Sequence, residues 1–173
     1  GEYPEISTWL EVSNESPACS KNSIAAFSFP IYVKAYSLQA QLEAYDIFAS
    51  ATQELPPLNG STIMLAGYTV KGVGSIPSDS AAFPHRNDNL MLAPMMMYAP
   101  QGPELDKQAA ELSEKLRGIL HEGSGQVEMH SYVNYACGEE SKKNIYGYGP
   151  WRQERLLALK NKYDPHRRFS FCA

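Results

Sequence analysis

Side chains that could perform acid–base chemistry gather in the C-terminal part of the sequence. Tyr132, Asn134 and Tyr135 stand within four residues, in the segment Tyr-Val-Asn-Tyr. A tyrosine has a pKa of about 10, so it acts as a base only where its surroundings, such as a nearby positive charge, favour the phenolate. The same pattern is typical of an ordinary strand whose tyrosines pack and whose asparagine ends it in a turn. The residues alone leave both interpretations open.

The segment 126–135 is predicted to be a strand. Along a strand, Tyr132 and Asn134 share one face, whereas Tyr135 points to the other. One site touched by both Asn134 and Tyr135 therefore requires the strand to end or twist there. The following residues, 136–138 (Ala-Cys-Gly), permit such a change of direction.

Three helices and three further strands are expected to position this segment. Further strands are predicted at 24–36 with a bend at Pro30, at 62–70 and at 90–98, where Pro94 makes the segment either an edge strand or two short pieces. Helices are predicted at 38–55, 104–121 and 151–163, with Pro150 in the first turn of the last one and Gly123 as the stop of the second. Residues 81–89 are turn-like, and Gly72 and Gly74 form a glycine-rich link.

Each predicted helix has one apolar face that we expect to be buried. These faces are Leu38, Leu42, Tyr45, Phe48 and Ala49; then Leu105, Ala109, Leu112, Leu116, Ile119 and Leu120; then Leu156, Leu159 and Tyr163. The fold class is therefore α+β, a mainly antiparallel sheet with helices packed on one side. A change of role is expected near residues 123–125.

The charge and hydropathy of the sequence do not favour a protein that binds nucleic acid or spans a membrane. The 173 residues have a formal net charge of −4 and no basic run on any one element, which does not favour a nucleic-acid or anionic-membrane surface. No apolar run approaches the roughly twenty residues that cross a bilayer. The first ten residues lack the features of a signal peptide.

Two glycosylation sequons, at Asn14 and Asn59, favour a secreted protein, and the second lies in a Pro-Pro-Leu-Asn-Gly turn. Three cysteines (Cys19, Cys137 and Cys172) are too few and too scattered for a disulfide framework or a zinc site, and their pairing stays open. The four histidines show no metal-ligand spacing, so no metal site is expected. Neither a dinucleotide fingerprint nor a nucleophile elbow is present.

An ordered set of residues in the tail resembles the C-terminal signature of the berberine-bridge-enzyme-like FAD-linked oxidases, of the vanillyl-alcohol-oxidase-type superfamily. The matching residues are Tyr132, Asn134, Tyr135, Tyr146, Gly147, Leu156, Lys160, Lys162, Asp164, Pro165 and Phe169. Upstream, the turn Phe83-Pro84-His85-Arg86 is similar to one that precedes a substrate-domain strand in that family. Together the resemblance covers roughly residues 24–171.

The resemblance implies roles for the three tail residues. Tyr135 corresponds to the catalytic base of several members, Asn134 to a residue against the flavin or its ribityl chain, and Tyr132 to an orienting wall of the cofactor site. It also implies that 1–125 is part of a substrate-binding domain and that 126–173 completes the FAD-binding domain.

The chain departs from the family pattern where some plant members have charged or polar residues. Ser75 stands in place of a glutamate, and Leu92 and Pro94 in place of a lysine and a glutamine. The expected pocket is therefore more apolar, with Met91, Met95, Met96 or Met97 as candidate walls; the same methionines are also typical of plain core packing. We expect Met95, Met97 and Tyr68 to bind the substrate.

The implied cofactor is FAD, yet nothing in the sequence resembles the family's flavin-holding N-terminal domain. The resemblance therefore implies a secreted heterodimeric or nicked oxidoreductase, active only with an N-terminal FAD-binding chain or fragment. It would oxidise a sugar, alcohol or secondary metabolite by hydride transfer to flavin. The alternative is a non-catalytic secreted α+β binding module without flavin.

Overall fold

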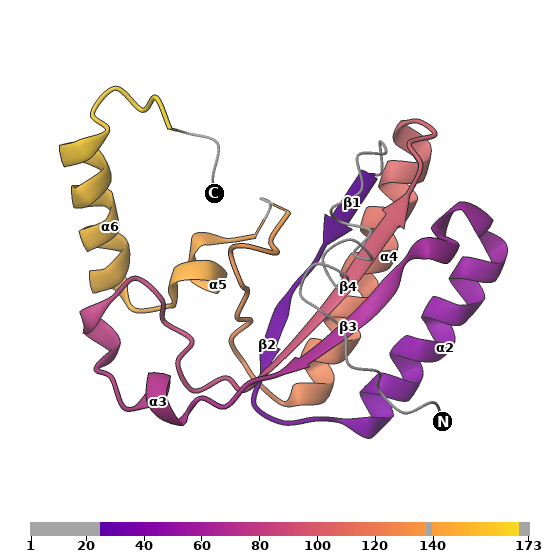
Figure 1. Ribbon diagram of the computed structural model, residues 1–173, viewed down its shortest axis with the longest axis horizontal. Helices are drawn as coiled ribbons and strands as arrows, with labels where there is room; N and C mark the ends of the chain where they lie inside the picture. The colour runs from indigo at the N-terminus through magenta and orange to yellow at the C-terminus, as the bar shows by residue number, and fades with distance from the viewer. Residues whose placement is uncertain (1–24, 138–139, 170–173) are drawn as a thin grey trace, which may run out of the picture.

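The computed structural model describes residues 25–137 and 140–169 (Figure 1). In chain order the elements are β1 (Ala25–Ser28), β2 (Ile31–Val33), α2 (Leu38–Glu54), the 3-10 helix η2 (Pro56–Gly60), β3 (Thr62–Gly67), α3 (Lys71–Gly74), the 3-10 helix η3 (Ser78–Ser80), β4 (Leu90–Tyr98), α4 (Pro103–Ser124), α5 (Lys142–Tyr146) and α6 (Pro150–Tyr163). None of these helices is both long and apolar enough to cross a bilayer.

β4 is the central strand of an antiparallel sheet. β1 and β2 follow one another along one of its edges, and β3 lies along the other edge. Leu92, for example, pairs with Ile31 on one side and with Leu65 on the other. The strand has the bounds that the sequence predicts, but it lies inside the sheet and is continuous, so the expectation of an edge strand or of two short pieces is wrong.

The pairing explains how Pro94 is tolerated inside a central strand. In an antiparallel ladder the N–H and C=O of one residue point toward the same edge. The Pro94 carbonyl accepts a hydrogen bond from the Phe29 N–H at 3.1 Å, so the proline nitrogen also faces the β1–β2 edge. That edge is interrupted between Ser28 and Ile31, at the bend predicted from Pro30. The Pro94 nitrogen, which has no proton to donate, therefore lies opposite the gap between β1 and β2, where no strand hydrogen bond is lost.

α4 covers one face of the sheet, and α2 packs against α4 (Figure 1). The core between these layers contains Ile31, Val33, Ala44, Leu58, Leu92, Met96, Tyr98, Leu105, Ala109, Leu116 and Leu120. Pro103 opens α4, and acidic residues in the first turn complement the positive end of the helix dipole. The predicted α+β class and the predicted face of the second helix are confirmed.

Two glycines near the end of α4 have different roles. Gly125 ends the helix, with a left-handed φ of 68°. Gly123, the predicted stop, is still helical, and a Cβ at this position would collide with the side chain of Ala40 on α2. Gly123 therefore permits the close approach of α4 to α2.

The predicted apolar face of α2 is largely wrong. Leu38, Leu42 and Tyr45 are more than half exposed, whereas Ala40 and Ala44 are buried. The small alanines face α4 because the Gly123 contact leaves no room for larger side chains there. The helix itself has the bounds expected from the sequence, to within one residue.

α6 has little packing of its own within the described residues. Of its fourteen residues only Arg152 is buried, and Leu159 and Tyr163 are 43% and 72% exposed. The helix is confirmed, but the burial predicted for these side chains is wrong. Figure 1 shows α6 on the far side of α5 from the sheet. The proposed division between residues 125 and 126 stays a prediction.

Gly123→Ala is expected to lower the free energy of unfolding, because the added methyl group collides with α2. Overpacking of this kind costs about 1–3 kcal/mol, more than the gain of up to about 1 kcal/mol in helix propensity. The matched control is Gly118→Ala, since a Cβ at Gly118 meets nothing within 4 Å. Urea unfolding should show the first variant destabilised and the second unchanged or stabilised. Equal stabilisation of both would contradict the close contact.

Candidate functional site

An aromatic cluster lies on the sheet face opposite the helices, with Tyr32 at its centre. Tyr32 follows Ile31, which faces the helix core, so its side chain points the other way. Its ring lies 6.2 Å from Phe83, 5.9 Å from His85 and 5.9 Å from Tyr132, between centroids. Edge-to-face and tilted arrangements at such distances are favourable for aromatic rings. Tyr32 therefore joins the sheet to two segments that are distant in the sequence.

Backbone pairing holds the tail segment against this cluster. Tyr32 pairs with Met91 across the sheet and forms an isolated bridge with His130 on its other side. The Tyr32 N–H donates to the His130 carbonyl at 2.8 Å. Ser131 N–H in turn donates to the carbonyl of Asn144 on α5. The chain after α4 is thereby fixed beside β2.

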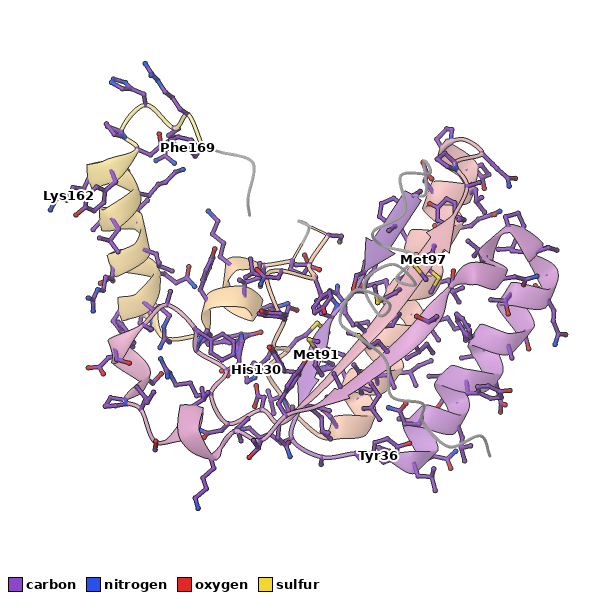
Figure 2. The ribbon with its side chains drawn as sticks, in the orientation of Figure 1. Tyr36, Met91, Met97, His130, Lys162 and Phe169 are labelled. Atoms are coloured by element: carbon purple, nitrogen blue, oxygen red, sulfur yellow. The ribbon has the colours of Figure 1, made fainter. Side chains whose placement is uncertain are left out.

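Two stacked histidines lie beneath the aromatic cluster. The rings of His85 and His130 are 4.2 Å apart and 22° from parallel. Nδ1 of His130 donates to Asp88 at 2.5 Å, and Nε2 of His85 donates to the Asn144 carbonyl at 2.7 Å. His85 and Asp88 are buried, and His130 is half-buried. In Figure 2, His130 lies close to Met91, in agreement with their shared pairing to Tyr32.

Burial sets the protonation of His85. It lowers the pKa of His85 to about 4; the neighbouring His130 lowers this pKa too, by more than the Asp88 charge raises it. His85 is therefore neutral near pH 7 and carries its proton on Nε2. Burial also raises the pKa of Tyr32 well above the ordinary value, so its hydroxyl stays protonated. Tyr32 can donate a hydrogen bond but cannot serve as the base.

His85, Asp88 and His130 also form a possible set of metal ligands, with one ligand atom from each within 4.8 Å of the others. A metal ion lies in the plane of each imidazole that binds it, about 2.0–2.1 Å from the nitrogen. Two nearly parallel rings 4.2 Å apart share no such point. The arrangement fits a hydrogen-bonded Asp–His pair better than a metal centre. The spacing of these residues in the sequence gives no hint that they meet.

The segment predicted as a strand at 126–135 is instead a single bridge followed by a turn. The Tyr135 and Ala136 N–H groups both donate to the Tyr132 carbonyl, at 3.0 and 3.1 Å. A turn frees the side chains from strict alternation, and the rings of Tyr132 and Tyr135 lie 5.6 Å apart. Asn134 donates from Nδ2 to the Tyr132 hydroxyl at 2.8 Å. The strand prediction is wrong, but the change of direction that it required is present.

The three expected substrate residues lie at different places on the same side of the molecule. Met95 and Met97 are half-buried and alternate with Met96, which faces the helix core, so they share the sheet face of Met91. Met91 and Met96 are fully buried, so the expectation that they line a pocket is wrong. Met97 stands six residues from Met91, or about 20 Å along the strand, and Figure 2 shows it well separated from His130. Tyr68 follows β3, is 51% exposed and adds to the electrostatic environment of Tyr32. Their roles stay predictions.

Asn59 is exposed at the surface of η2 and so is accessible to modification. Asn14 lies outside the described residues, as do Cys19 and Cys172. Sequence reasoning missed Tyr32, Asp88 and His130, because no local pattern shows that β2, the loop before β4 and the tail converge. The Phe-Pro-His-Arg turn was the one signal for His85.

Curated proteins are similar to this chain over nearly its whole length. No protein-family model matches it. It is 42% identical over 171 residues to the FAD-linked oxidoreductase chyH of Penicillium rubens, which covers 99% of this chain and 34% of that protein. It is 41% identical over 173 residues to the FAD-linked oxidoreductase chry5 of Gibberella zeae, covering 100% and 34%. The chain spans about a third of the length of the curated relatives it matches.

Solved structures match the fold. Berberine bridge enzyme from Eschscholzia californica superposes with a TM-score of 0.61 and 17% identity, over 85% of this chain and 32% of that one. BBE-like #28 from Arabidopsis thaliana gives a TM-score of 0.63 and 14% identity, over 86% and 33%. The chain thus has the fold found in part of the berberine-bridge type of flavoenzyme. It is homologous to the C-terminal part of the fungal FAD-linked oxidoreductases.

His85 is expected to make the fold sensitive to acid. Its pKa is lower in the folded state than the ordinary 6.5, so the unfolded chain binds more protons between pH 6.5 and about 4. Stability should therefore fall as the pH drops through this window, by on the order of 3 kcal/mol in total. Denaturant unfolding at a series of pH values measures this slope.

The variant His85→Gln keeps a donor for the Asn144 carbonyl but does not titrate, so it should flatten that slope. The exposed His166 provides the control, and His166→Gln should leave the slope unchanged. An unaltered slope in His85→Gln would mean that another group causes the acid sensitivity.

Proposed function

We propose that this chain is the substrate-side part of a secreted FAD-dependent oxidoreductase, in which Tyr135 acts as the base. The proposal is carried by the turn that sets Tyr135 beside Tyr132 and Tyr32, on the open side of the sheet. The relatives that are named FAD-linked oxidoreductases support the class of reaction. The substrate would be a small organic molecule such as a sugar, an alcohol or a secondary metabolite.

The chain's own residues would orient the substrate and move a proton. Tyr135 is half-buried and so can meet both a substrate hydroxyl and solvent. Asn134 fixes the Tyr132 hydroxyl by its hydrogen bond, and that hydroxyl keeps its own proton available for a second bond. When bound, FAD would accept the hydride at its isoalloxazine ring. The half-buried Met95 and Met97 of β4, with Tyr68, would supply apolar contacts to the substrate.

The described residues fit one wall of a flavin site. They offer phenol and amide groups, of the kind that hydrogen-bond a ring or a ribityl chain, at Tyr132 and Asn134. Two cavities of the described residues lie elsewhere, one lined by residues of η3 and α6 and the other by residues of α2 and α4. Most of the FAD contacts would come from another part of the enzyme. A positive charge favouring the phenolate would come from there too.

That other part would be the N-terminal FAD-binding portion, packed against the C-terminal segment. α6 and the following residues expose Trp151, Leu157, Leu159, Tyr163 and Phe169, each by 40% or more. Apolar side chains gathered on one weakly packed segment mark an interaction surface. The relatives are about three times as long as this chain, and the part of them that this chain does not match is long enough to form such an FAD-binding portion. The exposed Asn59 and the sequon at Asn14 support secretion and glycosylation.

The second candidate is a secreted α+β binding module that uses the aromatic cluster without flavin. The exposed Tyr68 and the partly exposed Tyr132 and Tyr135 would suit a planar ligand. A flavin absorbance band near about 450 nm in the assembled enzyme distinguishes the two functions, since a binding module has none.

Tyr135→Phe in the assembled, flavin-loaded enzyme should slow flavin reduction, because the phenylalanine cannot take the substrate proton. General-base catalysis contributes about 10²–10⁴-fold, so a loss of at least about 100-fold is expected. Stopped-flow reduction without oxygen measures this step. Tyr45→Phe, on the exposed side of α2, serves as the control. Unchanged reduction in Tyr135→Phe would exclude Tyr135 as the base.

Leu157→Asp with Tyr163→Asp should weaken assembly with the FAD-binding portion by about tenfold or more, since a charge would replace buried apolar contacts. Leu42→Asp on α2 is the matched control, because Leu42 is about as exposed as Leu157 but lies on a different surface. Binding of separately expressed portions by interferometry measures the effect. An equal loss in both proteins would contradict a surface centred on α6.

A further inference from the structure

Two buried arginines lie between η3 and α6, away from the aromatic cluster. Arg86 is 9% exposed and Arg152 is 6% exposed. Arg86 donates to the Val73 carbonyl at 3.4 Å and to the Ser80 hydroxyl at 3.3 Å. Arg152 donates from Nη2 to the carbonyl and hydroxyl oxygens of Ser78, at 2.6 and 2.8 Å. Both guanidinium groups therefore bind the same short segment, 73–80.

Neither arginine forms an ion pair with a carboxylate of residues 25–137 or 140–169. The Nε atoms of both are buried and have no hydrogen-bond partner there. Burial lowers the pKa of Arg152, the positive charge of Arg86 lowers it further, and Asp79 acts in the opposite direction. Two like charges that are buried close together are unfavourable. Asp79 offsets them only in part and forms no ion pair with either arginine, so the local charge favours a further anion.

A cavity of about 120 Å³ adjoins this pair. Its charged lining residues are Arg152, Arg155 and Asp79, two positive and one negative, and the Ser80 that holds Arg86 also lines it. The indole of Trp151 forms another wall, with the Arg152 guanidinium 4.4 Å from its ring centroid. The ring and the Ser78 bonds fix the plane of this guanidinium.

The start of α6 lies beside the same cavity. Its cap is Gly149, whose carbonyl accepts the Arg152 N–H at 3.2 Å, and Pro150 has no N–H to offer. The positive end of the helix dipole favours an anion near this turn. Nη2 of Arg152 is bound to Ser78, whereas its buried Nε has no hydrogen-bond partner among the described residues. A guanidinium with an unpaired N–H suits a planar or tetrahedral oxyanion.

We propose that Arg152, supported by Arg86 and the first turn of α6, binds one oxyanion in this cavity. Its source is either a free phosphate-type ion or a side-chain carboxylate of the remaining part of the enzyme. Both present the same oxygens to the guanidinium. Asp79 opposes the binding, and the two arginines with Arg155 outweigh it. The site does not depend on flavin or on Tyr135.

The first test titrates the complete 173-residue chain with sodium phosphate by calorimetry at low ionic strength, with sodium chloride as the reference salt. If the source is a free ion, phosphate binds saturably, one per chain. Arg152→Met should then weaken binding at least about tenfold, since a charge-assisted bidentate contact is lost. Arg152→Lys keeps the positive charge but loses the two-pronged guanidinium. It should bind phosphate more weakly than the original chain and more tightly than Arg152→Met. Lys115→Met, an exposed cation on α4, should bind as the original chain does.

The second test measures binding of the chain to the FAD-binding portion. If the source is a carboxylate there, phosphate does not bind saturably, but Arg152→Met weakens assembly and reduces its dependence on salt. Arg152→Lys keeps the charge and so keeps the salt dependence, but it weakens assembly because the bidentate contact is lost. Lys115→Met leaves assembly unchanged. Circular dichroism checks that each variant is folded. If Arg152→Met does not fold, the result for Arg152→Lys decides.

Either pattern supports an oxyanion site. The proposal is overturned if phosphate binds equally well to Arg152→Met, or if neither phosphate binding nor the salt dependence of assembly responds to Arg152. Flavin content is measured separately, so an enzyme without flavin would refute the proposed oxidase while leaving this result intact.

Discussion

The pairing of β4 on both of its edges is the constraint on which the rest of the structure depends. One edge receives β3 and the other receives β1 and β2, so neighbouring residues of β4 alternate between two different environments. Leu92 and Met96 enter the core under α4, whereas Met91 lies beneath Tyr32 on the opposite face. A slip of one residue would exchange these sets and would bury the site side chains under the helix.

The two faces of the sheet are stabilised in different ways. On the helix side, aliphatic side chains fill the space between β4, α2 and α4. On the other side, rings and hydrogen bonds join Tyr32, His85, Asp88 and His130, which belong to three separate segments. A buried polar network of this kind is stable only when its members are paired, so the neutral His85 and its bond to Asn144 are part of what holds the tail in place.

Much of the architecture could be predicted from the sequence, because strong local patterns decide it. The bounds of β4 and α6 follow from an apolar run, although it contains Pro94, and from a proline at a helix start. Burial was predictable for α4, whose apolar stripe meets the sheet, but not for α2, where the alanines rather than the leucines face inward. That reversal depends on Gly123, 83 residues after Ala40 along the chain.

The candidate site was predictable only in part, because its contacts also join segments that are far apart in the sequence. Tyr132, Asn134 and Tyr135 could be identified from their types and order. Their arrangement could not, since a turn rather than a strand carries them. The bridge between Tyr32 and His130 spans nearly a hundred residues, and no periodicity encodes such a contact.

The sparse packing of α6 has a consequence for biogenesis. Helices gain most of their stability from tertiary contacts, and this one retains little more than the anchoring of its first turn by Arg152. In a nascent protein it would consolidate late, after the sheet has formed, and would remain open to protease cleavage until the proposed FAD-binding portion covers it. Cellular quality control would in this way remove copies in which that proposed contact does not form.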